Sequence, residues 1–149
     1  MSEESFAGFL DDYYAESEEH LTSARAALLE LEASGHQPSN QRRVLDGLFR
    51  FFHSLKGISA MVELRPAEQL AHELESYLRA VRAGELAVTA DGITLLLEGT
   101  QMIEQIINAH RSKRSGPSIE SIAARIARAI PATTTATAVG SASSGTAAS

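Results

Sequence analysis

Residues 49–63 read FRFFHSLKGISAMVE, an apolar run that contains one histidine. The run belongs to a longer apolar pattern with steps of three and four residues: Val44, Leu45, Leu48, Phe49, Phe52 and Leu55. This spacing places the apolar side chains on one side of a helix and predicts that the helix packs against a core. His53 falls roughly 110° from the centre of that side, because an α-helix turns by about 100° per residue. We therefore expect one edge of its ring to face solvent.

Lys56 and Gly57 follow His53 at positions i+3 and i+4, so both lie next to it on the following helical turn. A glycine inside a helix costs about 0.5–1 kcal/mol relative to alanine, and its presence needs a reason. Gly57 either leaves the surface beside His53 bare for another protein, or makes a notch for a neighbouring helix. The pentapeptide HSLKG does not decide between these two interpretations.

Further apolar stripes with helical spacing run from Phe6 to Leu31, Leu70 to Val81, Ile93 to Ile107 and Ile119 to Ile130. Residues that begin or end helices lie between these stripes. The turn residues ASGHQPSN follow the first stripe, and Pro66 and Gly84 mark the start and the end of the third helix. Thr89 or Asp91 can cap the fourth helix, and SGP followed by Ser118 precedes the fifth. Short connections favour antiparallel neighbours. The sequence therefore predicts an all-α fold over residues 1–130, an up-down-up-down antiparallel four-helix bundle with an additional short fifth helix.

Residues 131–149 read PATTTATAVGSASSGTAAS and contain neither charged nor aromatic side chains. This composition is typical of a flexible, disordered linker or tail. A linker at this position would join the bundle to further domains of a longer protein.

Composition excludes several classes of protein. The 149 residues include no cysteine, which excludes disulfides, thiol catalysis and zinc–thiolate sites. Basic residues are not concentrated in one stripe, so nucleic acid is not expected as a partner. No apolar run approaches the roughly 18 residues of a membrane span, and the acidic start does not resemble a signal peptide. We expect a cytoplasmic protein that is a monomer as an isolated domain.

The segment LAHELESYL, residues 70–78, places His72 and Glu75 three residues apart on the third predicted helix. If the second and third helices are antiparallel neighbours, Glu75 can approach His53 across the groove between them. A carboxylate that accepts a hydrogen bond from Nδ1–H fixes the tautomer and leaves Nε2 unprotonated. That arrangement makes Nε2 a better nucleophile.

FRFFHSLKG followed by LAHELESYLRAVRAGEL resembles the N-terminal histidine-containing phosphotransfer (HPt) domain of CheA-type chemotaxis histidine kinases. The resemblance runs from about Phe6 to Ile130. It implies that His53 is the phosphoacceptor, Glu75 orients and activates it, and Lys56 stabilises the charge of the phosphoryl group. His72 would support the site and Gly57 would allow docking.

The resemblance also implies the partners of the chain. A separate kinase domain of the same parent protein would use ATP and Mg to phosphorylate His53. A CheY-like receiver domain of a response regulator would then take the phosphoryl group. The chain has neither GxxxxGK[ST] nor GxGxxG, so we expect it to bind no cofactor itself and not to be a complete enzyme in isolation.

Three alternatives stay open at this point. The chain could be a phosphotransfer module of a hybrid or multi-module sensor kinase. It could be a docking or structural bundle whose histidine is never phosphorylated. It could also be a metal-binding bundle that uses His53, His72 and Glu75, although the Glu-x-x-His pairs of di-iron bundles are missing at both histidines.

Overall fold

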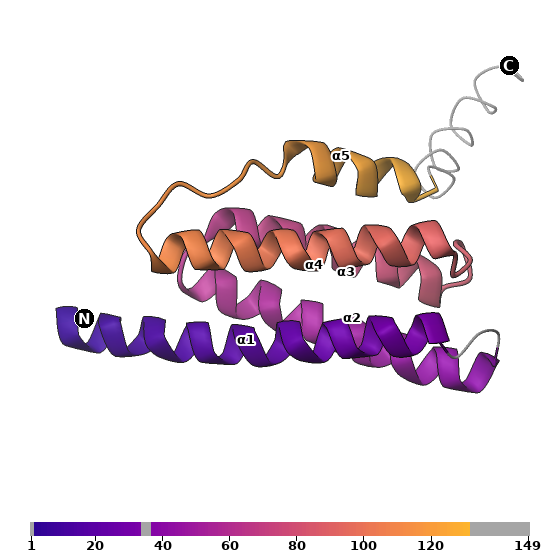
Figure 1. Cartoon of the computed structure of the whole chain (residues 1–149), viewed down its shortest axis with the longest axis horizontal. Helices are drawn as coiled ribbons and strands as arrows, with labels where there is room; N and C mark the ends of the chain where they lie inside the picture. Colours follow the sequence, from indigo (N-terminus) through magenta and orange to yellow (C-terminus); the bar gives the residue numbers. More distant parts are fainter. Residues whose placement is uncertain (1, 34–36, 132–149) are drawn as a thin grey trace, which may run out of the picture.

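The computed structural model describes residues 2–33 and 37–131, and these form five α-helices. Their bounds are α1 (Glu3–Ala33), α2 (Pro38–Met61), α3 (Arg65–Arg82), α4 (Ala90–Arg111) and α5 (Glu120–Ala129). The described ranges contain no strand. Figure 1 shows the first four helices running in alternating directions, and the contacts close a ring in which α1 and α3 each touch both α2 and α4. The predicted all-α bundle is confirmed. All of the predicted linker except Pro131 lies outside the described residues.

The short helix α5 covers one side of the bundle. It contacts α3 and α4 through the buried side chains of Ile122 and Ile126. In Figure 1 it lies above α4, on the side away from α1. As a consequence, α3 is packed against three helices, namely α2, α4 and α5. A helix with three neighbours buries more of its circumference than its own apolar stripe indicates.

A tight reversal brings α3 antiparallel beside α2. Glu63 has the left-handed backbone conformation, with φ of 60°. The amide of Leu64 donates to the carbonyl of Ser59 at 3.0 Å, and the amide of Glu63 donates to that of Ala60 at 3.1 Å. This pair of bonds is a Schellman motif, which ends a helix and satisfies its last carbonyls. The motif returns the chain along α2 and places α3 next to the helix that carries His53.

The predicted start and stop signals largely hold. Thr89, one of two candidates, caps α4, because its Oγ1 accepts from the amide of Gly92 at 2.9 Å. The prediction that Ser118 caps the fifth helix is wrong, because the N-cap of α5 is Ile119 and has no side-chain cap bond, although Oγ of Ser118 accepts from the amide of Glu120 at 3.3 Å. Gly84 ends α3 with φ of 81°, a conformation that glycine adopts without steric cost.

The core consists of the inner sides of all five helices. Its fully buried large apolar side chains are Leu28, Leu48, Phe52, Leu55, Leu70, Leu74, Leu78, Ile103 and Ile126. Several members of the predicted stripes are less buried than expected, and Phe6, Phe49 and Ile130 are examples. Phe6 is exposed, because the first turns of α1 extend past the ends of the other helices (Figure 1). Phe49 is only half-buried, at the edge of the α2–α3 groove.

Candidate functional site

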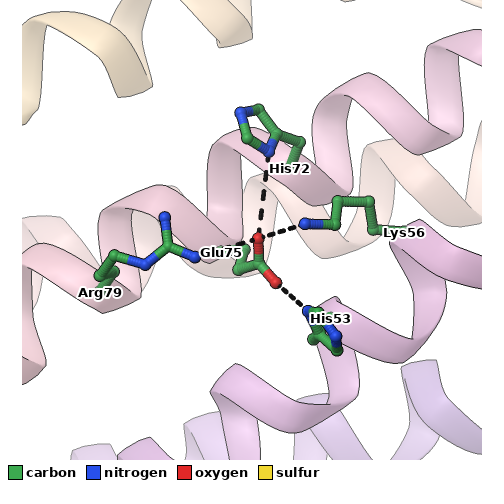
Figure 2. Close-up of polar contacts among 5 residues, drawn as sticks. All are labelled: His53, Lys56, His72, Glu75 and Arg79. Atoms are coloured by element: carbon green, nitrogen blue, oxygen red, sulfur yellow. Dashed lines mark hydrogen bonds and ion pairs between the residues drawn. The ribbon is translucent and has the colours of Figure 1, made fainter.

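The candidate site lies along the groove between α2 and α3. Helix α2 contributes His53 and Lys56, and α3 contributes His72, Glu75 and Arg79. Figure 2 shows the other four side chains converging on the carboxylate of Glu75. The structure therefore brings together the four charged or titratable residues that the sequence singled out, and adds Arg79.

Glu75 is the centre of this cluster, and its side chain is completely buried. Its Oε2 is hydrogen-bonded to Nδ1 of His53. Its Oε1 accepts from Nζ of Lys56 at 2.6 Å. A carboxylate can only accept, so Nδ1 of His53 carries the proton in this bond, as expected from the sequence. The unprotonated nitrogen of a neutral ring is then Nε2.

The sequence predicted that Glu75 can approach His53, but it did not predict that the side chain of Glu75 is buried. The side chains that converge on its carboxylate account for the difference, namely His53 and Lys56 from α2 and His72 and Arg79 from α3. Burial on its own raises the pKa of the Glu75 carboxyl, but the hydrogen bonds and charges of Lys56 and His53 outweigh burial and lower that pKa below its ordinary value. The carboxylate is therefore ionised at neutral pH and bears a negative charge directly against the imidazole.

Two more groups lie around Oε1 of Glu75 at longer distances. Nη2 of Arg79 is 3.6 Å away, and Nδ1 of His72 is 4.0 Å away (Figure 2). His72 therefore lies beside the carboxylate but outside hydrogen-bond distance. Sequence reasoning missed Arg79, although its i+4 spacing from Glu75 is the signal that could have found it.

The imidazole of His53 is accessible, with 64% of its side chain exposed. Its ring lies nearly parallel to that of Phe49, with an interplanar angle of 9° and 6.2 Å between centroids. This separation is within the range of offset-stacked aromatic pairs. Glu75 therefore holds one edge of the ring and Phe49 lies along one face, while most of the side chain stays open to solvent. That is the arrangement expected of a residue at the edge of the apolar stripe.

The space around Gly57 decides one open question. A Cβ atom at this exposed position would meet nothing within 4 Å, so Gly57 is not a notch for a neighbouring helix. Gly99 shows what such a notch looks like, because a Cβ there would lie 2.7 Å from Cδ2 of Leu74. The packing interpretation of Gly57 is wrong, and its role in docking stays a prediction.

Two further observations concern metal sites and membrane spans. Among residues 2–33 and 37–131, no group of three or more His, Asp or Glu side chains could hold a metal ion, so the metal-binding alternative has no ligand set there. Over the same part of the chain, no helix is long and apolar enough to cross a membrane.

Comparison with known proteins gives one family. The model of the Hpt domain matches residues 8–112. The chain is 38% identical to the chemotaxis protein CheA of Halobacterium salinarum over 100 residues, which are 67% of this chain and 14% of that protein. It is 36% identical to the chemotaxis protein CheA of Bacillus subtilis over 110 residues, 71% of this chain and 16% of that protein. The chain thus spans only a small part of these relatives.

A solved structure supports the same fold. The phosphorylated P1 domain of CheA3, in complex with CheY6 from R. sphaeroides, superposes with a TM-score of 0.69 at 22% identity. The match covers 82% of this chain and 98% of that one. Together, these findings confirm the resemblance predicted from residues 49–57 and 70–86.

Proposed function

Because the chain belongs to the Hpt domain family, we propose that it is the phosphorelay carrier of a CheA-type chemotaxis kinase and that His53 is its phosphoacceptor. The observation that carries this proposal is the bond between Nδ1 of His53 and the buried carboxylate of Glu75. It gives one accessible imidazole a fixed tautomer and an adjacent negative charge.

The chemistry of acceptance follows from that geometry. Nε2 of His53 attacks the γ-phosphorus of ATP in line, a bond forms between them, and the bond to the bridging oxygen breaks so that ADP leaves. Phosphoryl transfer depends mainly on positioning and on charge stabilisation. The ring gains positive charge as Nε2 becomes bonded to phosphorus. Glu75 stabilises that charge through Nδ1–H. Lys56 supplies a cation for the phosphoryl oxygens, and His72 supports the cluster around Glu75.

The remaining assignments concern partners. ATP and Mg belong to a separate kinase domain of the parent protein, which docks against the bare surface at Gly57. The phosphoryl group then passes to an aspartate of a CheY-like receiver domain. We assign residues 1–130 to the phosphotransfer module and residues 131–149 to a linker, and we place the module in the cytoplasm.

The test is transfer of radiolabel. The chain is incubated with labelled ATP and a chemotaxis-type kinase core that lacks its own phosphoacceptor, and the product is treated with acid and alkali. His110, on α4, serves as the control, because its Nδ1 is hydrogen-bonded to the hydroxyl of Tyr14 and not to a carboxylate. We expect acid-labile, alkali-stable label on the wild type and on His110→Gln, and none on His53→Gln. Undiminished labelling of His53→Gln would refute the assignment. Transfer from the labelled chain to receivers of hybrid kinases, but not to CheY-like receivers, would favour the hybrid or multi-module sensor kinase instead.

A further inference from the structure

Lys56 has two tasks that compete. In the resting structure its ammonium group is 2.6 Å from Oε1 of Glu75. The proposed function also needs this cation at the phosphoryl group on Nε2 of His53. Nδ1 faces Glu75, and Nε2, bonded to the other side of Cε1, directs its lone pair away from the carboxylate. Lys56 therefore has to turn away from Oε1 when the phosphoryl group arrives, and its flexible stem allows this movement.

The departure of Lys56 would leave Oε1 of Glu75 without its hydrogen bond. The Glu75 side chain is completely buried, so water does not readily replace the lost partner. An unpaired buried carboxylate is strongly unfavourable, and it would respond by taking up a proton. A protonated Glu75 could not stabilise positive charge on His53. The site therefore needs a second cation that can reach Oε1.

Arg79 meets this need by position and by chemistry. It lies one helical turn beyond Glu75, and its Nη2 is 3.6 Å from Oε1, just beyond hydrogen-bond distance. Its side chain is 60% exposed and can move the remaining few tenths of an ångström. His72 is farther from Oε1, and its ring is charged only when protonated. A guanidinium group is always charged and presents several donors.

We infer that Arg79 is a positioning residue that takes over Oε1 of Glu75 while Lys56 turns to the phosphoryl group. This inference rests on the proposed function of His53. Arg79 does not touch the reacting atoms in this scheme. It acts through Glu75, by keeping the carboxylate ionised and oriented towards Nδ1 of His53 throughout the transfer. Figure 2 shows Arg79 and His53 on either side of that carboxylate.

Arg82 provides a matched control three residues later on the same helix. Its guanidinium carries the same charge and lies over the Phe49 ring at 4.4 Å, as Arg79 does at 5.6 Å. Its Nε, however, pairs with Oδ1 of Asp46 at 2.9 Å rather than with Glu75. Methionine keeps a long apolar stem at either position. Arg79→Met removes the guanidinium next to Glu75, whereas Arg82→Met leaves that guanidinium in place.

The first experiment measures phosphorylation by the kinase core. Arg79→Met should lower kcat about tenfold, the effect of losing one hydrogen bond to a charged group, with little change in KM. Arg79→Lys should restore part of the rate, and Arg82→Met should change it less than twofold. Equal losses for Arg79→Met and Arg82→Met would overturn the inference, and so would a rise in KM alone, which would assign Arg79 to docking.

The second experiment uses the unphosphorylated protein and does not depend on the proposed function. The ¹³C signal of the Glu75 carboxyl is titrated in Lys56→Met, and then with Arg79→Met or Arg82→Met added. The pKa of Glu75 should rise further with Arg79→Met than with Arg82→Met, and equal values would contradict the inference. If the wild type took up no label while this difference held, the proposed function would fail and the pairing of Arg79 with Glu75 would stand.

Discussion

His53 and His110 make the same kind of bond with different partners. Nδ1 of His53 is bonded to the carboxylate of Glu75 on the α2–α3 side of the bundle. Nδ1 of His110 is bonded to the hydroxyl of Tyr14 at 2.7 Å, between α4 and α1. Each ring is thus held at one nitrogen by a neighbouring helix. Holding the ring is therefore not what distinguishes the candidate site.

The charge of the partner makes the difference. Lys56 and His53 lower the pKa of Glu75, so His53 faces an ionised carboxylate at neutral pH. Burial raises the pKa of the Tyr14 hydroxyl, against the charge of Arg111, so His110 faces a neutral phenol. Only the first partner can stabilise an imidazole that becomes positively charged during phosphoryl transfer. The comparison therefore supports the proposal that His53 is the phosphoacceptor, and it favours a structural role for His110.

The largest expected effect separates the two partners. Glu75→Gln keeps the shape of the side chain but removes its charge, and it should slow phosphorylation of His53 by roughly 100-fold, within the range for loss of a positioned catalytic group. Tyr14→Phe removes the bond to His110 and should change the rate less than twofold. Both rates are measured with the same kinase core and labelled ATP. Equal rates for wild type and Glu75→Gln would remove Glu75 from the mechanism and break the comparison.

Gly57 and Gly99 allow an open surface to be compared with a packed one, because a Cβ atom has free space at Gly57 and meets Leu74 at Gly99. Gly57→Lys adds a long side chain beside His53 and should hinder kinase docking several-fold. It should not lower the free energy of unfolding, because the space is empty and lysine favours a helix more than glycine does. Gly99→Ala, on the helix that carries His110, forces a contact with Leu74 and should lower the free energy of unfolding by about 1–3 kcal/mol.

Labelling rates and urea unfolding measure the two effects of these glycine substitutions. An unchanged labelling rate for Gly57→Lys would mean that its bare surface has no role in docking. An unchanged midpoint for Gly99→Ala would mean that Leu74 adjusts to the added methyl group.

The pH dependence of stability should also differ between the two regions. The folded-state pKa of Glu75 lies below its ordinary value of 4.5, so its contribution is present above that pH and is lost as pH falls through the folded-state pKa. The pKa of Tyr14 lies above 10.0, so its contribution is present below that pH and is lost as pH rises through the folded-state value.

Urea titrations across pH test both directions. Glu75→Gln should flatten the loss of unfolding free energy below pH 4.5, and Tyr14→Phe should flatten the loss above pH 10. Curves parallel to that of the wild type would show that neither partner is linked to folding through its ionisation.

The smallest effect concerns the residues that follow α2 and α4, the helices that carry His53 and His110. Glu63 after α2 and Lys113 after α4 both have positive φ, at 60° and 58°, in matching Schellman motifs. Replacing either by glycine should raise the free energy of unfolding by about 0.5–1 kcal/mol, because relief of backbone strain exceeds the entropy that glycine adds to the unfolded chain. Thermal unfolding measures the shift. A gain in the free energy of unfolding at only one of the two positions would show that the C-terminal ends of α2 and α4 are not equally strained.

The helices could be predicted because their signals are local. Steps of three and four residues, Thr89 at a helix start and Gly84 at a helix end depend on neighbours within a few residues. The accessible edge of the His53 ring follows from the turn of about 100° per residue in an α-helix. The approach of Glu75 needed one further assumption, that α2 and α3 are antiparallel neighbours, and the structure bears it out.

The rest of the site depends on how the helices pack. The complete burial of Glu75 depends on side chains that reach it from α2 as well as from α3, and the apolar spacing of α3 alone does not reveal them. The bond from Lys56 to Glu75 and the stack of Phe49 on His53 depend on side-chain rotamers and on the register of neighbouring turns. The bond between Tyr14 and His110 joins residues far apart in the sequence. Such contacts are set by the tertiary structure rather than by spacing.

The most direct test of the central claim is the position of the phosphoryl group on the phosphorylated protein. In protein labelled with ¹⁵N at histidine, ³¹P–¹⁵N couplings identify the bonded nitrogen. With Nδ1 of His53 held by Glu75, we predict a single phosphohistidine at Nε2 of His53. A phosphoryl group on Nδ1 of His53, or on His72 or His110, would contradict the account.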